Sequence, residues 1–310
     1  MASSFNAIAS LLSCPEDGEP LCCVLGELLC PRCARRFPIH GENLVEILPG
    51  RPYQLPASVS PAYREAYIRA FEQPFCHDDT ALAWGAEETV PESWALKRRR
   101  QVAMVRPLIS EGVTPDDSVL CDISAGSGYY TLAFAPLFRF VIHCDLSVDN
   151  LNYVSRKARA LGIQNIFFLR ADYFAPPFRH SLDRIICLDT LIRGGGHDSV
   201  LLRAIVRSLK PGGHAVVDFH NWWHNPLRRL GVLRDNFLDN TSYTRGELQR
   251  LLASTGIHQF EIKPFVQEVD PGQPAGKFFL RLIPPTRFMV RLPAWSEPST
   301  RGSVVRAAGA

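Results

Sequence analysis

The chain has 310 residues, of which 46% are hydrophobic and 21% are charged, a composition typical of globular proteins with a large core. Its net charge of +3 is too small to require a polyanionic partner, and no apolar run reaches the roughly 20 residues that span a bilayer. The N-terminus lacks the pattern of a secretory signal, and the nine cysteines do not resemble a secreted disulfide framework. We therefore expect a cytoplasmic protein without a membrane partner.

Residues 1–50 form a cysteine-rich head, with five of the nine cysteines between positions 14 and 33. One Cys-x-x-Cys pair is intact, while the preceding one reads Cys-Pro-Glu-Asp. Because tetrahedral zinc also accepts a carboxylate, we predict a structural Zn²⁺ site made by Cys14, Asp17, Cys30 and Cys33. Cys22 or Cys23 is an alternative to Asp17, and a ribbon that packs without metal is the alternative to the whole site.

Residues 51–112 are expected to form a helical connector or lid. Helical patterns cover Pro61–Phe71 and Trp94–Ile109. The second pattern contains the cationic run Lys97–Arg106, which fits a solvated helix face better than a phosphate-binding surface.

From residue 113 to 292, short apolar runs alternate with amphipathic stretches. The runs predict strands within 118–124, 140–147, 165–172, 182–189 and 212–220, and helices within 148–162, 198–213 and 243–256. Buried strands joined by helices indicate an α/β fold with a doubly wound, mostly parallel sheet. Two extended runs, 259–269 and 276–285, predict an antiparallel edge strand, and 293–310 is predicted to be a disordered tail.

The first of these strands leads into a glycine turn, "DISAGSGYY". No lysine follows Gly128, so the turn is not a phosphate-binding loop of the GxxxxGK[ST] type. Thr131 stands where the dinucleotide-binding fingerprint has a small residue, so an oxidoreductase is the least favoured function. Four acids end four successive strands, namely Asp122, Asp145, Asp172 and Asp189. Carboxyl ends of parallel strands meet at one ligand crevice, so these acids favour an adenosine-like ligand with positive charge. Aspartate is also common at strand ends for purely structural reasons.

These segments, with "HCDLS", "LRADYF", "LDRIICLDT" and "LRAIVRSLKPGG", resemble the successive motifs of class I S-adenosylmethionine-dependent methyltransferases. The resemblance implies a Rossmann-like seven-stranded sheet and S-adenosyl-L-methionine as cofactor. It implies cofactor contacts from Asp122, Ser124, Ala125, Gly126, Gly128, Asp145, Leu146, Ala171, Asp172, Tyr173 and Asp189. The chain departs from the family at Ser124, where glycine is usual. The head is similar to the zinc-ribbon-like (Trm112-like) domain found ahead of some methyltransferases.

The methyl acceptor is expected to be a small molecule, since the [DN]PP[YF] and Pro-Cys motifs of nucleic-acid base methylation are absent. His220 and His197 are candidate general bases, and Asn221, Trp222, Trp223 and His224 are candidate acceptor-binding residues. The same residues can instead pack a lid or cap helices. An rRNA or tRNA base methyltransferase and a non-catalytic cofactor-binding scaffold are the alternatives. The acceptor atom stays open, and the chain is expected to be a monomer or homodimer.

Overall fold

The structure is a computed structural model that describes residues 8–41, 43–57, 59–83, 85–190, 197–224, 242–265 and 286–294. Its strands form one mixed sheet in the order β1-β2-β3-β4-β7-β6-β5-β8-β9-β12-β11, with β10 paired to β9. Their bounds are β1 Cys22–Val24, β2 Glu27–Leu29, β3 Arg36–His40, β4 Leu44–Ile47, β5 Val119–Ile123, β6 Phe140–Asp145, β7 Ile166–Ala171, β8 Leu182–Cys187, β9 Leu209–Asn221, β10 Ser242–Tyr243, β11 Glu261–Phe265 and β12 Arg287–Pro293.

The central strands β7, β6, β5, β8 and β9 are parallel, and this confirms the predicted doubly wound sheet. The antiparallel strand is β12, which pairs with β9 on one side and β11 on the other. It therefore lies one place inside the end of the sheet. Of the two runs expected to supply this strand pair, 259–269 contains β11, and 276–285 lies outside the described residues together with the tail from 295.

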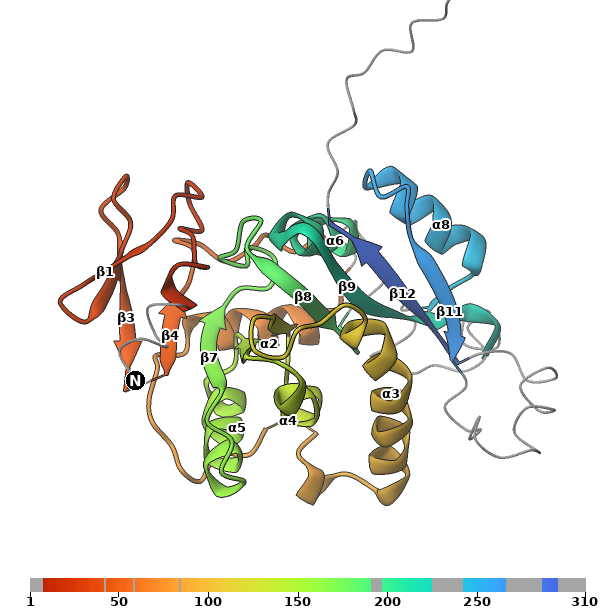
Figure 1. Ribbon diagram of the computed structural model, residues 1–310, viewed down its shortest axis with the longest axis horizontal. Coiled ribbons are helices and arrows are strands. Elements are labelled where there is room, and N and C mark those ends of the chain that lie inside the picture. The colour runs from red at the N-terminus through yellow and green to blue at the C-terminus, as the bar shows by residue number, and fades with distance from the viewer. Residues whose placement is uncertain are drawn as a thin grey trace, which may run out of the picture.

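The helices cover both faces of the sheet, as Figure 1 shows with α3, α4 and α5 on one side and α6 and α8 on the other. Their bounds are α2 Pro61–Glu72, α3 Glu92–Ser110, α4 Tyr129–Phe134, α5 Val148–Ala160, α6 His197–Ser208 and α8 Arg245–Ser254. Local sequence sets their starts: the Ser60 and Ser147 side chains cap α2 and α5, and Thr244 with Glu247 forms a capping box on α8. Among the described residues, no helix has the length and apolar character needed to cross a membrane.

The head continues the central sheet instead of standing apart from it. Strands β1 to β4 run antiparallel to one another, and β4 then pairs in parallel with β7 from Leu44↔Phe168 to Ile47↔Ala171. Residues predicted to form the zinc-ribbon-like unit thus share backbone hydrogen bonds with the domain that begins near residue 113. The red head and the green β7 are neighbours in Figure 1.

One buried arginine ties the head, the connector and the central sheet together. Arg170 on β7 is 1% exposed, and it forms an ion pair with Glu46, its partner in register on β4. Its other guanidinium nitrogens donate to the Leu146 carbonyl after β6 and to carbonyls at the end of α2, including that of Ala70. A buried cation that donates hydrogen bonds to several fixed acceptors holds the head, the connector and the central sheet in position.

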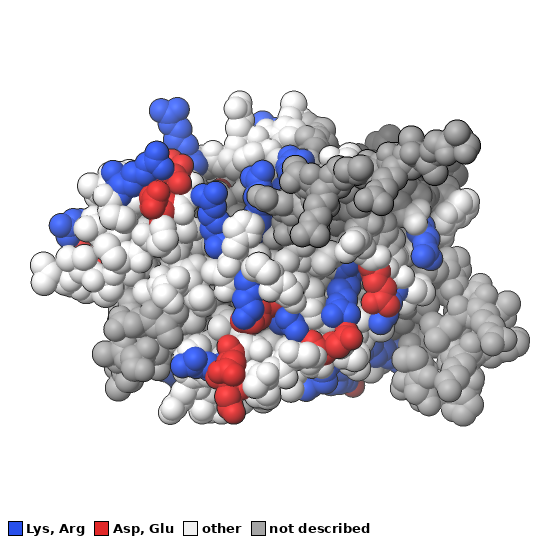
Figure 2. Space-filling model, turned by 45° about the horizontal axis from the view of Figure 1, so that its top comes forward, with Lys and Arg blue, Asp and Glu red and all other residues white. Residues whose placement is uncertain are grey.

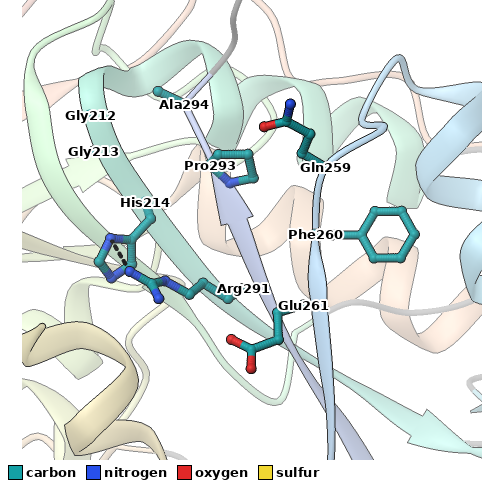
Figure 3. A pocket seen from close by; sticks show the side chains of 9 residues that line it. All are labelled: Gly212, Gly213, His214, Gln259, Phe260, Glu261, Arg291, Pro293 and Ala294. Carbon is teal, nitrogen blue, oxygen red and sulfur yellow. Dashed lines mark hydrogen bonds between the residues drawn. The ribbon is translucent and has the colours of Figure 1, made fainter.

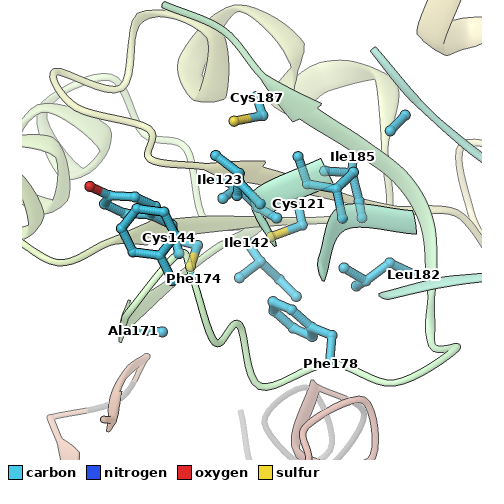
Figure 4. Close-up of a cluster of buried hydrophobic side chains, with 14 of the residues drawn as sticks. Cys121, Ile123, Ile142, Cys144, Ala171, Phe174, Phe178, Leu182, Ile185 and Cys187 are labelled. Carbon is cyan, nitrogen blue, oxygen red and sulfur yellow. The ribbon is translucent and has the colours of Figure 1, made fainter. Parts of the chain in front are cut away.

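The core under the central strands is lined by aliphatic, aromatic and thiol side chains, shown in Figure 4. Cys121, Cys144 and Cys187 lie on β5, β6 and β8 and are fully buried. Burial raises the pKa of the Cys121 and Cys187 thiols, so they stay protonated and serve as small apolar side chains. Cys76, the other cysteine outside the head, is exposed and lies in no strand.

Candidate functional site

A cavity of about 450 Å³ opens at the carboxyl ends of β5, β6, β7 and β8. This is the edge at which open α/β sheets bind ligands, and the volume falls within the range of small-molecule sites. Helices α2 and α3 supply one wall, and the strand ends supply the other. Predicted cofactor residues that line it are Asp122, Ser124, Ala125, Gly126, Asp145, Leu146, Tyr173 and Asp189. Gly128, Ala171 and Asp172 are not among its lining residues.

The glycine turn forms the floor of the cavity through three left-handed residues. Ser124, Gly126 and Gly128 have φ of 57°, 54° and 68°. A Cβ at Gly128 would lie 2.5 Å from Cγ1 of Val154, so this glycine allows α4 to approach α5 and contributes packing instead of a ligand contact. Ser124 carries a side chain in a conformation that favours glycine, which gives a backbone reason for the family's preference at this position.

Asp145 holds the loop that follows β6. Its Oδ2 accepts the Gly126 N–H at 2.7 Å, and its Oδ1 accepts the Ser147 N–H at 2.9 Å and the Asn150 side-chain N–H at 3.0 Å. Burial raises the pKa of Asp145, and these hydrogen bonds oppose the rise. The carboxylate therefore connects the glycine turn to the start of α5 while still lining the cavity.

Asp122 belongs to a buried relay that the sequence did not reveal. The Thr131 hydroxyl donates to Oδ2 of Asp122 at 2.7 Å and lies 2.9 Å from Nδ1 of His143. Burial raises the pKa of Asp122 to about 7 and lowers that of His143 to about 3. His143 is therefore neutral. Because the Thr131 hydroxyl donates to Asp122, it accepts from His143, so Nδ1 of His143 carries the ring proton. A carboxyl with a pKa of about 7 changes its charge near neutral pH.

Asp189 enters a charged cluster behind the cavity wall. Arg287 on β12 forms ion pairs with both Asp189 and Asp218, and Lys97 on α3 lies 3.7 Å from Asp189. Oδ1 of Asp218 also accepts the Asp189 backbone N–H at 2.7 Å. Burial alone would raise the pKa of Asp189, but Arg287 and Lys97 outweigh it and hold that pKa below its usual range. Asp189 is thus a fixed anion, held in a left-handed conformation with φ of 61°.

Asp172 has partners other than the one predicted for it. It is fully buried, its Oδ2 accepts the Tyr67 hydroxyl at 2.6 Å, and its Oδ1 accepts the Phe174 N–H at 2.9 Å. The Tyr67 hydroxyl in turn accepts the Tyr53 N–H at 2.7 Å. Asp172 therefore docks α2 onto the end of β7 instead of facing the cavity. Ala171 is likewise buried, paired with Ile47 of the head.

Tyr173 does line the cavity, and its hydroxyl is hydrogen-bonded to that of Tyr63 on α2. With Tyr67, these side chains form an aromatic wall from the connector and the loop after β7. Tyr63 and Tyr67 are four residues apart, so the sequence predicts that they share one face of α2. It does not predict that this face contacts Tyr173.

The described residues that line the cavity include none of the candidate acceptor residues. His220 is half-buried near the end of β9, in register with Arg287 of β12, which forms an ion pair with Asp189. Asn221 is buried, and Trp222 and Trp223 have ring centroids 4.4 Å apart, with Trp223 56% exposed. His197 begins α6, and His224 ends a 3-10 helix; their side chains lie outside the described part of the structure.

The predicted metal ligands of the head come together. Ligand atoms of Cys14, Asp17, Cys30 and Cys33 all lie within 4.8 Å of one another. The Cys14 and Cys33 Sγ atoms are 3.7 Å apart, and Cys30 Sγ is 3.4 Å from Oδ2 of Asp17. Tetrahedral zinc bonds imply about 3.8 Å between two sulfurs and about 3.5 Å between sulfur and oxygen. The donor set and its spacing therefore fit Zn²⁺.

Both arms of this site fold as the same knuckle. The Cys14 N–H donates to the carbonyl five residues on and its carbonyl accepts the Gly18 N–H, and the Cys30 backbone repeats this pattern with Ala34. Gly18 and Ala34 have φ of 75° and 58°. Asp17 therefore takes the place that Cys33 takes in the intact arm. The alternative ligands Cys22 and Cys23 lie exposed on β1 instead.

A second cavity, of about 360 Å³, opens at the opposite end of the sheet, between β9, β11 and β12. Figure 3 shows His214 beside Arg291, whose Nη2 lies 3.3 Å from the His214 Nδ1. The His214 Nε2 donates to the Leu108 carbonyl at 2.7 Å, and Arg291 forms an ion pair with Glu111. His214 and Arg291 thus already have protein partners, and the cavity lies away from the strand ends that bind ligands.

Comparison with known proteins agrees with the geometry of the first cavity. Residues 120–213, which span the glycine turn to the start of β9, match the family described as "Methyltransferase domain". The chain carries a methyltransferase domain. The resemblance found in the sequence is confirmed over this range, and no curated protein matches the chain.

Solved structures similar to this chain include geranyl diphosphate C-methyltransferase from Streptomyces coelicolor, 15% identical, covering 75% of this chain and 97% of its own, with a TM-score of 0.49. Magnesium protoporphyrin IX methyltransferase from Synechocystis is 14% identical and covers 76% and 95%, with a TM-score of 0.47. A Haloferax volcanii complex of the Trm112 methyltransferase activator with a putative methyltransferase is 16% identical and covers 66% and 94%, with a TM-score of 0.48.

Proposed function

We propose that this chain transfers a methyl group from S-adenosyl-L-methionine to a small-molecule acceptor. The observation that carries the proposal is the 450 Å³ cavity at the carboxyl edge of the methyltransferase domain, lined by the glycine turn and three carboxylates. Asp145 and Leu146 would hold the adenosine part, and Asp122 would accept the ammonium group of the methionine part. When bound, the cofactor supplies an electrophilic methyl on a sulfonium.

The acids of the cavity suit this cofactor on charge alone. Asp122, Asp145 and Asp189 would repel the diphosphate of a dinucleotide, but they stabilise a ligand that carries sulfonium and ammonium charges. The fixed negative charge on Asp189 is the most persistent of the three, because Arg287 and Lys97 hold its pKa low. This arrangement supports a methyl donor over a hydride carrier.

A small-molecule acceptor agrees with the distribution of charge on the surface. On the face drawn in Figure 2, many of the Lys and Arg side chains of the described residues lie beside Asp or Glu, which partly neutralises the basic surface that a nucleic-acid backbone would contact. We propose His220 as the base for an acceptor that must lose a proton, since it pairs in register with Arg287, the ion-pair partner of the cavity residue Asp189.

We further propose that the head holds a structural Zn²⁺ through Cys14, Asp17, Cys30 and Cys33. The fit of these donors to tetrahedral geometry supports it. Metal analysis of the purified chain, compared with a variant in which Asp17 and Cys30 are both replaced by Ser, tests the site directly.

The activity is tested with S-adenosylmethionine whose methyl group is trideuterated. The protein is incubated with separate small-molecule and RNA fractions of a cell extract, and mass spectrometry locates the label. Label in small molecules, lost in Asp145→Ala and reduced in His220→Ala, is the expected result. Label confined to RNA would refute the small-molecule acceptor, and the absence of S-adenosylhomocysteine binding would refute the cofactor.

A further inference from the structure

Arg98 is the only cation among the described residues that line the cavity. The remaining charged lining residues are the acids Asp122, Asp145 and Asp189. The methionine part of the proposed cofactor carries an α-carboxylate besides its positive charges, and these acids repel it. A site built for that molecule needs one positive group placed for the carboxylate.

The neighbouring cations are already neutralised. Lys97 lies 3.7 Å from Asp189, and Arg287 forms ion pairs with Asp189 and Asp218. Within the part of the chain that the structure describes, Arg98 has no carboxylate partner; its Nη1 donates to the Gly85 carbonyl at 2.7 Å. Its positive charge therefore remains available to a ligand.

The guanidinium is also held in one place. Its central carbon lies 5.6 Å from the centre of the Tyr129 ring, and Tyr129 is the first residue of α4, directly after the glycine turn. Gly85 has φ of 70°, which favours glycine, and a Cβ there would lie 2.8 Å from Nη2 of Arg98, so a side chain at this position would make the guanidinium shift. The cation–π contact with Tyr129 and the hydrogen bond to Gly85 hold the guanidinium beside the turn that follows β5.

The β5 end is the half of the cavity that belongs to the methionine part. Asp122 ends β5 there, while Asp145 and Leu146, which suit the nucleoside, follow the next strand β6. We propose that Arg98 binds the α-carboxylate of the cofactor with its guanidinium fork, opposite the Asp122 carboxylate that accepts the ammonium group. The inference rests on the proposed function and names a positioning residue of the same site.

The test compares two ligands that differ in the amino-acid part. S-adenosylhomocysteine carries the carboxylate, and 5′-methylthioadenosine lacks the whole amino-acid part; both are titrated by calorimetry into the full chain. Arg98→Ala should weaken S-adenosylhomocysteine binding about 10- to 100-fold, the range for losing a hydrogen bond to a charged group. Its affinity for 5′-methylthioadenosine should change less than about twofold, within the context-dependence of such contacts.

Arg99→Ala is the matched control, because Arg99 is the exposed neighbour on the same helix. It should leave both affinities unchanged, and Arg98→Lys should recover part of the loss, since it keeps charge without the fork. Equal weakening of both ligands in Arg98→Ala, or no weakening of either, overturns the inference and leaves the cofactor site standing. A wild-type chain that binds neither ligand removes the proposed function as well.

Discussion

Cofactor binding should weaken as the pH falls below 7, because Asp122 then loses its charge. Burial raises the pKa of this carboxyl from its ordinary value of 3.8 to about 7, and the hydrogen bond from Thr131 offsets only part of the rise. An acid with a raised pKa is neutral below that pKa and anionic above it. The ammonium group of the ligand is attracted only by the anionic form.

The size of the effect follows from the fraction of Asp122 that is ionised. Around pH 6, one unit below its pKa, roughly one molecule in ten carries the charge, so the dissociation constant should rise about tenfold relative to pH 8, or about 1.4 kcal/mol. Above pH 7.5 the affinity should be flat. Asp189 does not produce this step, because Arg287 and Lys97 hold its pKa below its usual range.

Calorimetric titration of S-adenosylhomocysteine between pH 5.5 and 8.5 measures the profile, with 5′-methylthioadenosine as the neutral control. Asp122→Asn should bind weakly and without pH dependence, and the control ligand should show no step in the wild-type chain. A tenfold step that persists in Asp122→Asn, or one that appears equally with the neutral ligand, would assign the titration to another group and refute the reasoning.

Four further changes test other parts of the structure. Ser124→Gly should raise the free energy of unfolding by about 0.5–1 kcal/mol in urea titrations, since it removes a left-handed non-glycine residue. In the zinc-loaded chain the exposed Cys33 thiol should resist a thiol reagent and become reactive after chelation, as mass mapping would show. Arg170→Met should lower the free energy of unfolding by about 3–5 kcal/mol, because it leaves Glu46 unpaired, and an unchanged urea midpoint would contradict this. His220→Ala should reduce turnover about 100-fold with unchanged S-adenosylhomocysteine affinity, whereas a purely structural histidine would lower both.

Local signals in the sequence were enough to predict the central parallel strands and the turn at the floor of the cavity. Apolar runs predicted β5 to β9 because parallel strands buried on both faces lack alternation, and the glycine spacing placed the turn after β5. The acids Asp122 and Asp145 reach the cavity because strand ends of a parallel sheet share one edge.

Contacts between distant segments could not be predicted in this way. Asp172 follows the same strand-end rule, yet Tyr67, a hundred residues earlier, occupies its carboxylate. Arg287 begins β12, beyond the extended runs that the pattern indicated, so its ion pair with Asp189 had no signal in the sequence. These arrangements depend on which elements pack together, and a single sequence does not state that.

The pairing of β4 with β7 makes the cysteine-rich head a permanent part of the folded unit. Removing the residues before about 113 would leave β7 as an edge strand, with backbone amide and carbonyl groups free to pair with another chain. It would also leave the buried Arg170 without the Glu46 carboxylate. Such a fragment would tend to self-associate. The cysteine knuckles or their metal can therefore change in evolution, but the head cannot be lost unless another segment covers the β7 edge of the sheet.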